Sequence, residues 1–124
     1  MITPAILTPR RPLALPAGAS PLLAVVVDTE EEFEWSAPFS RSATSVEALS
    51  ELDRLQEVCT EHGVIPTYVC DWPVVTSPQG ERALSAHLEA GRCEVGAHLH
   101  PWVTPPHTEE VTDHNSYPGN LPPD

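Results

Sequence analysis

The chain has 124 residues, with 18 acidic residues against 6 arginines and no lysine, and a formal net charge of −12 at pH 7. This length suffices for one modest domain. The acidic balance argues against a nucleic-acid partner, because neutralising phosphates requires a basic face. No apolar run approaches the roughly 18 residues of a membrane span, so we expect none.

Residues 1–20 are rich in proline, alanine and leucine without any periodic pattern, and we interpret them as a flexible leader. Prolines interrupt the apolar residues and a basic start is missing, so the leader does not have the pattern of a secretion signal and we expect a cytoplasmic protein. The three cysteines are odd in number and widely spaced, which is typical of small buried residues in a reducing compartment.

An uninterrupted leucine and valine run predicts a strand over residues 22–28 that is buried on both faces. Asp28 then lies at the carboxyl end of this strand, and Glu30 follows two residues later. Side chains two apart in an extended chain share a face, so one carboxylate could bind a metal while the other carries a proton. Clustered like charges are usually solvated, so three further glutamates are interpreted as surface residues. These are Glu31, Glu32 and Glu34.

Three aromatic residues, Phe33, Trp35 and Phe39, accompany this acidic segment. They suit stacking against a sugar ring, and they equally suit a lid over the core beneath. The sequence leaves both interpretations open.

The next segments alternate between helix and strand. Thr44 and Glu47 have the spacing of a capping box and predict a helix over about residues 46–61. A second strand is expected at residues 65–70, followed by Asp71, which either borders the site or caps a turn. Ser77-Pro78 then predicts the start of a helix over about residues 79–90.

A third strand is expected at residues 93–98, and it ends in His98, with His100 two residues further on. In an extended chain both imidazoles point to one side, and imidazole is the commonest protein ligand for zinc. Alternating strands and helices predict a parallel sheet with right-handed crossovers. Because the carboxyl ends of parallel strands meet at one edge, the histidines should lie near Asp28 and Glu30.

In combination, these stretches resemble the start of a polysaccharide deacetylase, a member of the NodB-homology superfamily of carbohydrate esterases, and within it the WalW-like branch. The resemblance spans about residues 22–123. It is carried by Asp28-Thr29-Glu30, Pro66-Thr67-Tyr68, Asp71-Trp72-Pro73, residues 96–102 and residues 115–122. It implies an α/β fold, a partial and truncated (β/α) barrel of parallel strands with crossover helices. Residues 21–124 would form the N-terminal part of the deacetylase-like domain.

The resemblance also implies a divalent cation, with zinc as the preferred candidate, bound by one acid and two histidines. By position Asp28 matches the general base, Glu30 the metal-binding acid and His98 the first ligand histidine.

The family's second ligand histidine lies four residues after the first, where this chain has Trp102. His100 is therefore the candidate for the second ligand, and His107 is the reserve.

The activity implied is metal-dependent hydrolysis of N-acetyl amide bonds in a carbohydrate substrate. The family's later motifs, an arginine that orients the base and a histidine that acts as acid, have no match in this sequence. We therefore expect a fragment that does not deacetylate at a useful rate by itself. The alternative is a non-catalytic remnant that binds a metal, a saccharide or a partner without turnover. An amidohydrolase barrel is disfavoured, because its His-x-His motif belongs on the first strand.

Overall fold

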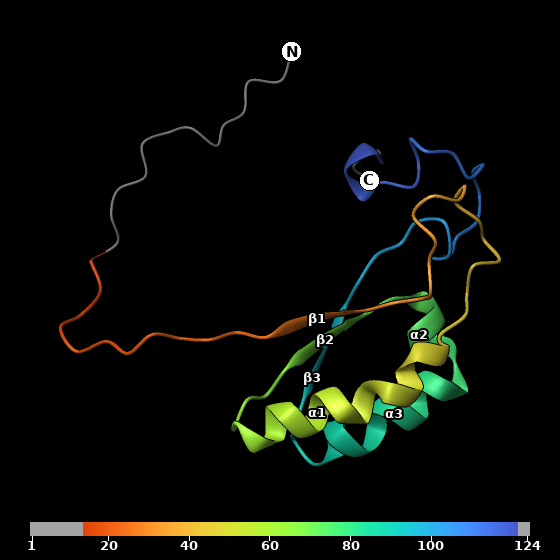
Figure 1. Ribbon diagram of the computed structural model, residues 1–124. Coiled ribbons are helices and arrows are strands. Elements are labelled where there is room, and N and C mark those ends of the chain that lie inside the picture. The colour runs from red at the N-terminus through yellow and green to blue at the C-terminus, as the bar shows by residue number, and fades with distance from the viewer. Residues whose placement is uncertain (1–13, 122–124) are drawn as a thin grey trace.

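The computed structural model describes residues 14–121 and shows a mixed α/β fold with an open, parallel, three-stranded sheet in the order β1-β2-β3 (Figure 1). The strands are β1 (Val26–Thr29), β2 (Thr67–Cys70) and β3 (Glu94–Ala97). The register places Val69 between Asp28 and Gly96. The parallel α/β sheet predicted from the sequence is confirmed, although each strand is shorter than expected.

Helical segments connect the strands. They are η2 (Glu47–Glu51), α1 (Leu52–Glu61), α2 (Trp72–Thr76), α3 (Pro78–Glu89) and, near the end, η3 (Pro118–Asn120). Two of these correspond to the predicted helices, but the first begins as a 3₁₀ turn. The short helix α2 was not predicted, because its five residues contain a proline and two valines, which disfavour a helix in isolation.

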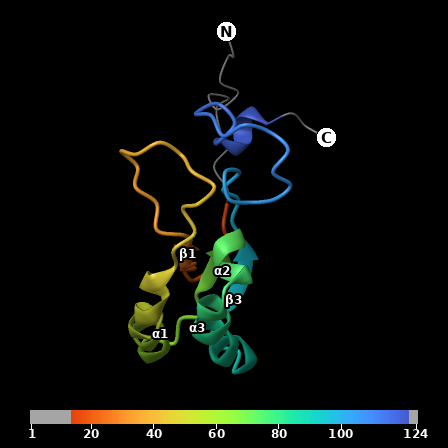
Figure 2. The ribbon, with the colours of Figure 1, turned by 90° about the vertical axis from the view of Figure 1, so that its right-hand side faces the viewer.

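Helices α1 and α3 cover the same face of the sheet (Figures 1 and 2). Tyr68 and Cys70 of β2 point into this layer and form a core with Leu52 of α1 and Leu84 of α3. A polar group is buried there as well. Gln56 of α1 is 1% exposed. Its side-chain oxygen accepts a hydrogen bond from the Tyr68 hydroxyl (3.1 Å) and its side-chain nitrogen donates to a backbone carbonyl (3.0 Å), so both polar atoms of the amide have a partner.

The first strand is not buried on both faces, and that prediction is wrong. Leu22 and Leu23 precede β1 and are 99% and 77% exposed, while Val26 is 61% exposed. The helices cover only the face of Tyr68, so the alternate residues, Val26 and Asp28 among them, lie on the uncovered face. An apolar run does not reveal how many faces of a strand are covered.

The capping box predicted at Thr44 and Glu47 is also absent. The residue that precedes η2 is Val46, which provides no side-chain cap. Glu32 supplies the acceptor instead, because its carboxylate accepts from the Ala48 amide (2.7 Å) and from the Ser45 hydroxyl. These hydrogen bonds lower the pKa of Glu32. The start of the helix is therefore satisfied by an acid from the preceding loop.

The loops after β1 and after β3 gather beyond the carboxyl edge of the sheet (Figures 1 and 2). Of the predicted leader, residues 1–13 lie outside the described residues, and residues 14–20 contain neither helix nor strand. Within residues 14–121, no helix is long and apolar enough to cross a membrane.

Candidate metal centre

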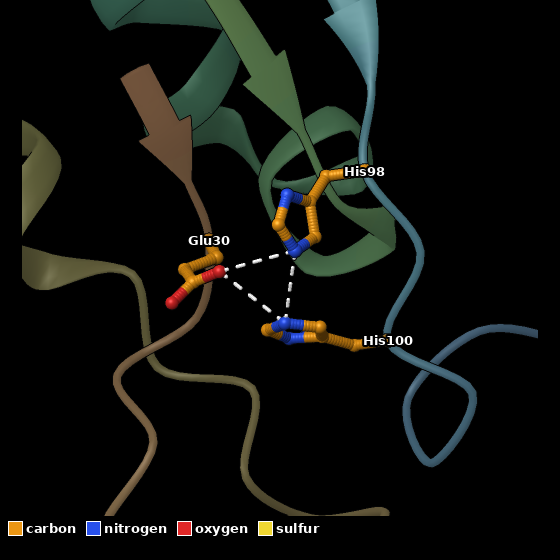
Figure 3. A group of neighbouring side chains, drawn as sticks. All are labelled: Glu30, His98 and His100. Carbon is orange, nitrogen blue, oxygen red and sulfur yellow. Dashed lines mark hydrogen bonds and ion pairs between the residues drawn. The ribbon is translucent and has the colours of Figure 1, made fainter. Parts of the chain in front are cut away.

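Three side chains converge beyond the carboxyl edge of the sheet: Glu30 follows β1, and His98 and His100 follow β3 (Figure 3). Glu30 Oε2 lies 3.3 Å from His98 Nε2 and 3.2 Å from His100 Nε2. The two Nε2 atoms are 3.0 Å apart, and the imidazole planes are nearly perpendicular, at 89°. Ligands of a tetrahedral zinc ion, at bond lengths of about 2.0–2.2 Å, are separated by about 3.3–3.6 Å. Two sides of the triangle, 3.0 and 3.2 Å, are slightly shorter than this separation and the third, 3.3 Å, equals its lower end, so a small outward shift of the side chains would let all three donor atoms bind one cation.

The strand register explains the convergence. The sheet continues one residue past β3, since the His98 amide donates to the Cys70 carbonyl at 2.8 Å. His98 therefore follows Gly96 on the uncovered face, as Glu30 follows Asp28. A β-carbon on Gly96 would lie 3.0 Å from a methyl group of Val69, so the strands pack tightly at this point.

Asp28 borders the triangle without being part of it. Its Oδ1 lies 3.5 Å from His98 Nδ1, on the opposite side of the ring from Glu30, and its side chain is 69% exposed. A carboxylate at this place can orient the ligand histidine, and it can accept a proton from a neighbouring water.

Glu31 is buried, and its interpretation as a surface residue is wrong. The residue is only 2% exposed. Its Oε2 lies 2.8 Å from His100 Nδ1, and its Oε1 accepts a 2.8 Å hydrogen bond from Trp102 Nε1. Its backbone amide donates to Asp71 Oδ2 at 2.9 Å. The two side-chain partners lie 69 and 71 residues away in sequence, so nothing near Glu31 signals its burial.

Burial and charge shift the protonation of this buried pair. Burial raises the pKa of Glu31, the His100 hydrogen bond opposes that rise, and Asp71 adds to it. For His100, burial by itself lowers the pKa, but the Glu31 hydrogen bond and the charges of Glu31, Glu30 and Asp71 outweigh burial and raise it. His100 therefore keeps its second proton, and with it a positive charge beside Glu31, to higher pH than a free histidine does.

Asp71 occupies a structural position. Its Oδ1 accepts the Val74 amide at 3.0 Å and caps α2, while its Oδ2 holds the Glu31 backbone. Glu31, Asp71 and His100 form a second group with metal-ligand atoms close together. However, each of the four carboxylate oxygens in this group already faces an N–H group, whereas Glu30 accepts no such hydrogen bond among the described residues. The Glu30, His98 and His100 triangle is thus the better place for a cation.

The reserve ligand, His107, does not reach this triangle. It is exposed, and its Nδ1 contacts the Arg41 guanidinium. Among residues 14–121, only His98 and His100 supply imidazole groups to the two potential metal-binding groups.

The aromatic residues form one cluster over the outer wall of the site. The rings of Phe33 and Phe39 stack at 5.1 Å, and both contact Trp102, which is 4% exposed. Trp35 and Tyr117 contact this stack at its edges and are 69% and 52% exposed. Trp102 therefore joins this cluster to His100, on which it stacks, and the outer two rings present aromatic surface to solvent.

A hollow of about 490 Å³ opens beside His98. Its walls are mainly apolar, with Trp72, Val75, Val95 and Leu99 among them.

Comparisons with protein-family models, with curated proteins and with solved structures find no match to this chain. A proposal of function therefore rests on the chemistry of the cluster and its surroundings.

Proposed function

We propose that Glu30, His98 and His100 bind a divalent cation, zinc by preference, and that the protein is a metal-dependent hydrolase of N-acetyl amide bonds in carbohydrates. The proposal is carried by one observation, the triangle of donor atoms with sides of 3.0, 3.2 and 3.3 Å. One carboxylate and two imidazoles leave a coordination position open, as catalytic zinc sites require.

The proposed roles of the side chains follow from their positions. A cation held by the triangle would supply a polarised carbonyl and an activated water. Asp28 lies next to the triangle and is exposed, so it is the group placed to accept the proton of that water. Glu30 and the two histidines hold the cation, and Glu31 lies behind His100 without access to solvent.

The arrangement of the sheet supports the implied barrel. The strands follow one another in sequence order and both long helices cover one face. This winding is typical of a (β/α) barrel wall, whereas a doubly wound sheet has helices on both faces. The cluster lies at the carboxyl edge, where barrels of this kind hold their sites.

A carbohydrate substrate is supported by the exposed rings of Trp35 and Tyr117, which belong to the aromatic cluster that reaches His100 through Trp102. Sugar rings stack on exposed aromatic side chains through their apolar faces. The hollow of about 490 Å³ provides room for a ligand beside His98, one of the three proposed cation ligands.

Metal binding without turnover is the second candidate. The observation that favours it concerns Asp28, whose ion-pair partner within residues 14–121 is His98 and not an arginine. A general base whose carboxylate is not held by an arginine side chain lacks the support that fixes catalytic geometry.

Zinc titration by competition with a coloured chelator tests the metal site. We expect His98→Ala to abolish zinc binding and His62→Ala to leave it unchanged, because His62 is exposed at the end of α1. Cobalt should report the same pattern through its visible spectrum. Equal zinc affinity in the wild type and in His98→Ala would disprove the site.

Acetate release from a chitin oligomer, with zinc supplied, separates the two candidates. We compare the 124-residue chain with a version extended through the downstream reading frame. We expect turnover from the extended version, and a loss of about 10²–10⁴-fold in its Asp28→Asn variant, the usual contribution of a general base. Equal turnover by both versions would show that these residues suffice. Zinc binding with no acetate release from either would favour the non-catalytic candidate.

A further inference from the structure

We infer that Glu31 is a positioning residue of the metal centre, whose buried carboxylate holds the His100 imidazole with a proton on Nδ1 and turns the Nε2 lone pair toward the cation position. This inference rests on the proposed metal binding, and it assigns a role to a residue that does not itself touch the cation position.

The contacts fix the His100 ring from two directions. Glu31 Oε2 lies 2.8 Å from Nδ1, while Nε2 lies 3.2 Å from Glu30 Oε2 (Figure 3 shows the second contact). The Trp102 ring stacks on the imidazole at 4.2 Å and 21° and donates its own N–H to Glu31 Oε1 at 2.8 Å. The side chains of Glu31 and His100 are 0% and 8% exposed, so water does not compete for these bonds.

The backbone of Glu31 is anchored as firmly as its side chain. Its amide donates to Asp71 Oδ2 at 2.9 Å, and Asp71 Oδ1 accepts the amide of Val74 in α2 at 3.0 Å. Glu31 is therefore tied through its backbone to the start of α2 and through its carboxylate to the loop that carries His100.

The chemistry of Glu31 and His100 decides which ring nitrogen of His100 carries the proton. A neutral imidazole donates through one nitrogen and accepts through the other, and an ionised carboxylate only accepts. Glu31 therefore requires a proton on His100 Nδ1, which leaves Nε2 free to bind a cation. Ligand histidines commonly depend on such a carboxylate, and its removal typically costs about 10–100-fold in metal affinity.

Glu31→Gln tests this role with little change of shape. A glutamine side chain has one acceptor oxygen and one donor amide, but two N–H groups, from His100 and Trp102, face it. If the oxygen stays on Trp102, the amide group faces Nδ1, and His100 must carry its proton on Nε2. We expect zinc affinity to fall about 10–100-fold.

A second substitution distinguishes positioning from a purely structural role. Trp102→Phe removes the indole N–H but keeps an aromatic ring beside His100. In the double variant Glu31→Gln/Trp102→Phe the glutamine oxygen is free to accept from Nδ1, so zinc should bind more tightly than in Glu31→Gln alone. If Glu31 served the fold only, two substitutions in one buried network would bind zinc no better than one.

Nitrogen-15 NMR of the histidines in the wild-type protein measures the orientation directly and needs no variant. We expect His100 Nδ1 to carry a proton that exchanges slowly with solvent. A deprotonated Nδ1 would overturn the inference, as would wild-type zinc affinity in Glu31→Gln or a double variant no tighter than the single one. Loss of zinc in His98→Ala with undiminished affinity in Glu31→Gln would overturn the role of Glu31 alone. A wild-type chain that binds no zinc would overturn the proposed function as well.

Discussion

Two adjacent glutamates, Glu30 and Glu31, have different surroundings in this molecule. Glu30 lies on the open side of the sheet and is 28% exposed in its side chain, so it can meet a cation from solvent. Glu31 points into the protein, where both carboxylate oxygens accept hydrogen bonds. A change at either position acts on His100, but from opposite sides of the ring.

The assignment of His100 as the second ligand histidine can be tested by substitution of single residues. We predict that His100→Ala lowers zinc affinity by about 100-fold or more. Loss of a residue that only hydrogen-bonds a metal ligand already costs about 10–100-fold, and loss of a ligand itself should cost more. His107→Ala should change it little, because His107 contacts Arg41 outside the triangle. Competition titration of the two variants measures both effects. If His100→Ala binds normally and His107→Ala does not, the ligand assignment moves to His107.

At the scale of elements, α2 and α3 share a single residue at their junction. Ser77 ends α2 and caps α3, since its hydroxyl accepts the Gly80 amide at 2.9 Å and donates to the Val74 carbonyl at 3.1 Å. The chain turns sharply here, which brings Gly80 against the backbone of α2. A β-carbon on Gly80 would lie 2.0 Å from the Val74 carbonyl oxygen.

Gly80→Ala should therefore destabilise the protein by about 1–3 kcal/mol, the usual cost of overpacking. The gain in helix propensity, at most about 1 kcal/mol, does not offset a clash with backbone. Gly119→Ala is the matched control, because nothing lies within 4 Å of its added β-carbon and its φ is not positive. Urea unfolding followed by circular dichroism measures both variants. Equal stability of the two would mean that α2 and α3 can separate without cost.

At the scale of the whole molecule, the core buries groups that lose a proton only at alkaline pH. Burial, with added effects of neighbouring charges, raises the pKa of Cys70 from an ordinary 9.0 to about 11 and that of Tyr68 from 10.0 to about 12. Burial also raises the pKa of Cys93. These groups stay neutral in the folded protein at a pH where the unfolded chain ionises them.

We predict a loss of stability between about pH 9 and pH 12. In this range the unfolded chain binds fewer protons than the folded one, so the free energy of unfolding falls as pH rises. Each tenfold difference in proton affinity is worth about 1.4 kcal/mol. Urea unfolding at pH 7, 9, 10 and 11 measures the decline, and Cys70→Ala should reduce it. A free energy of unfolding that does not change from pH 7 to pH 11 would contradict the prediction.

The sequence by itself determined the features that depend on neighbouring residues. Runs of apolar residues and helical spacing located three parallel strands and two helices. The two-residue spacings placed Asp28, Glu30, His98 and His100 at one edge of the sheet, where the structure brings their side chains together. That they bind a cation stays a prediction.

Only the tertiary structure decided which faces are covered and which polar groups are buried. It left one face of β1 uncovered, let Glu32 replace the predicted cap, and buried Glu31 beneath the site. Each of these outcomes depends on contacts between residues far apart in sequence, up to 71 positions for Glu31 and Trp102. Local periodicity records the direction of a side chain, but burial depends on what the rest of the chain places in front of it.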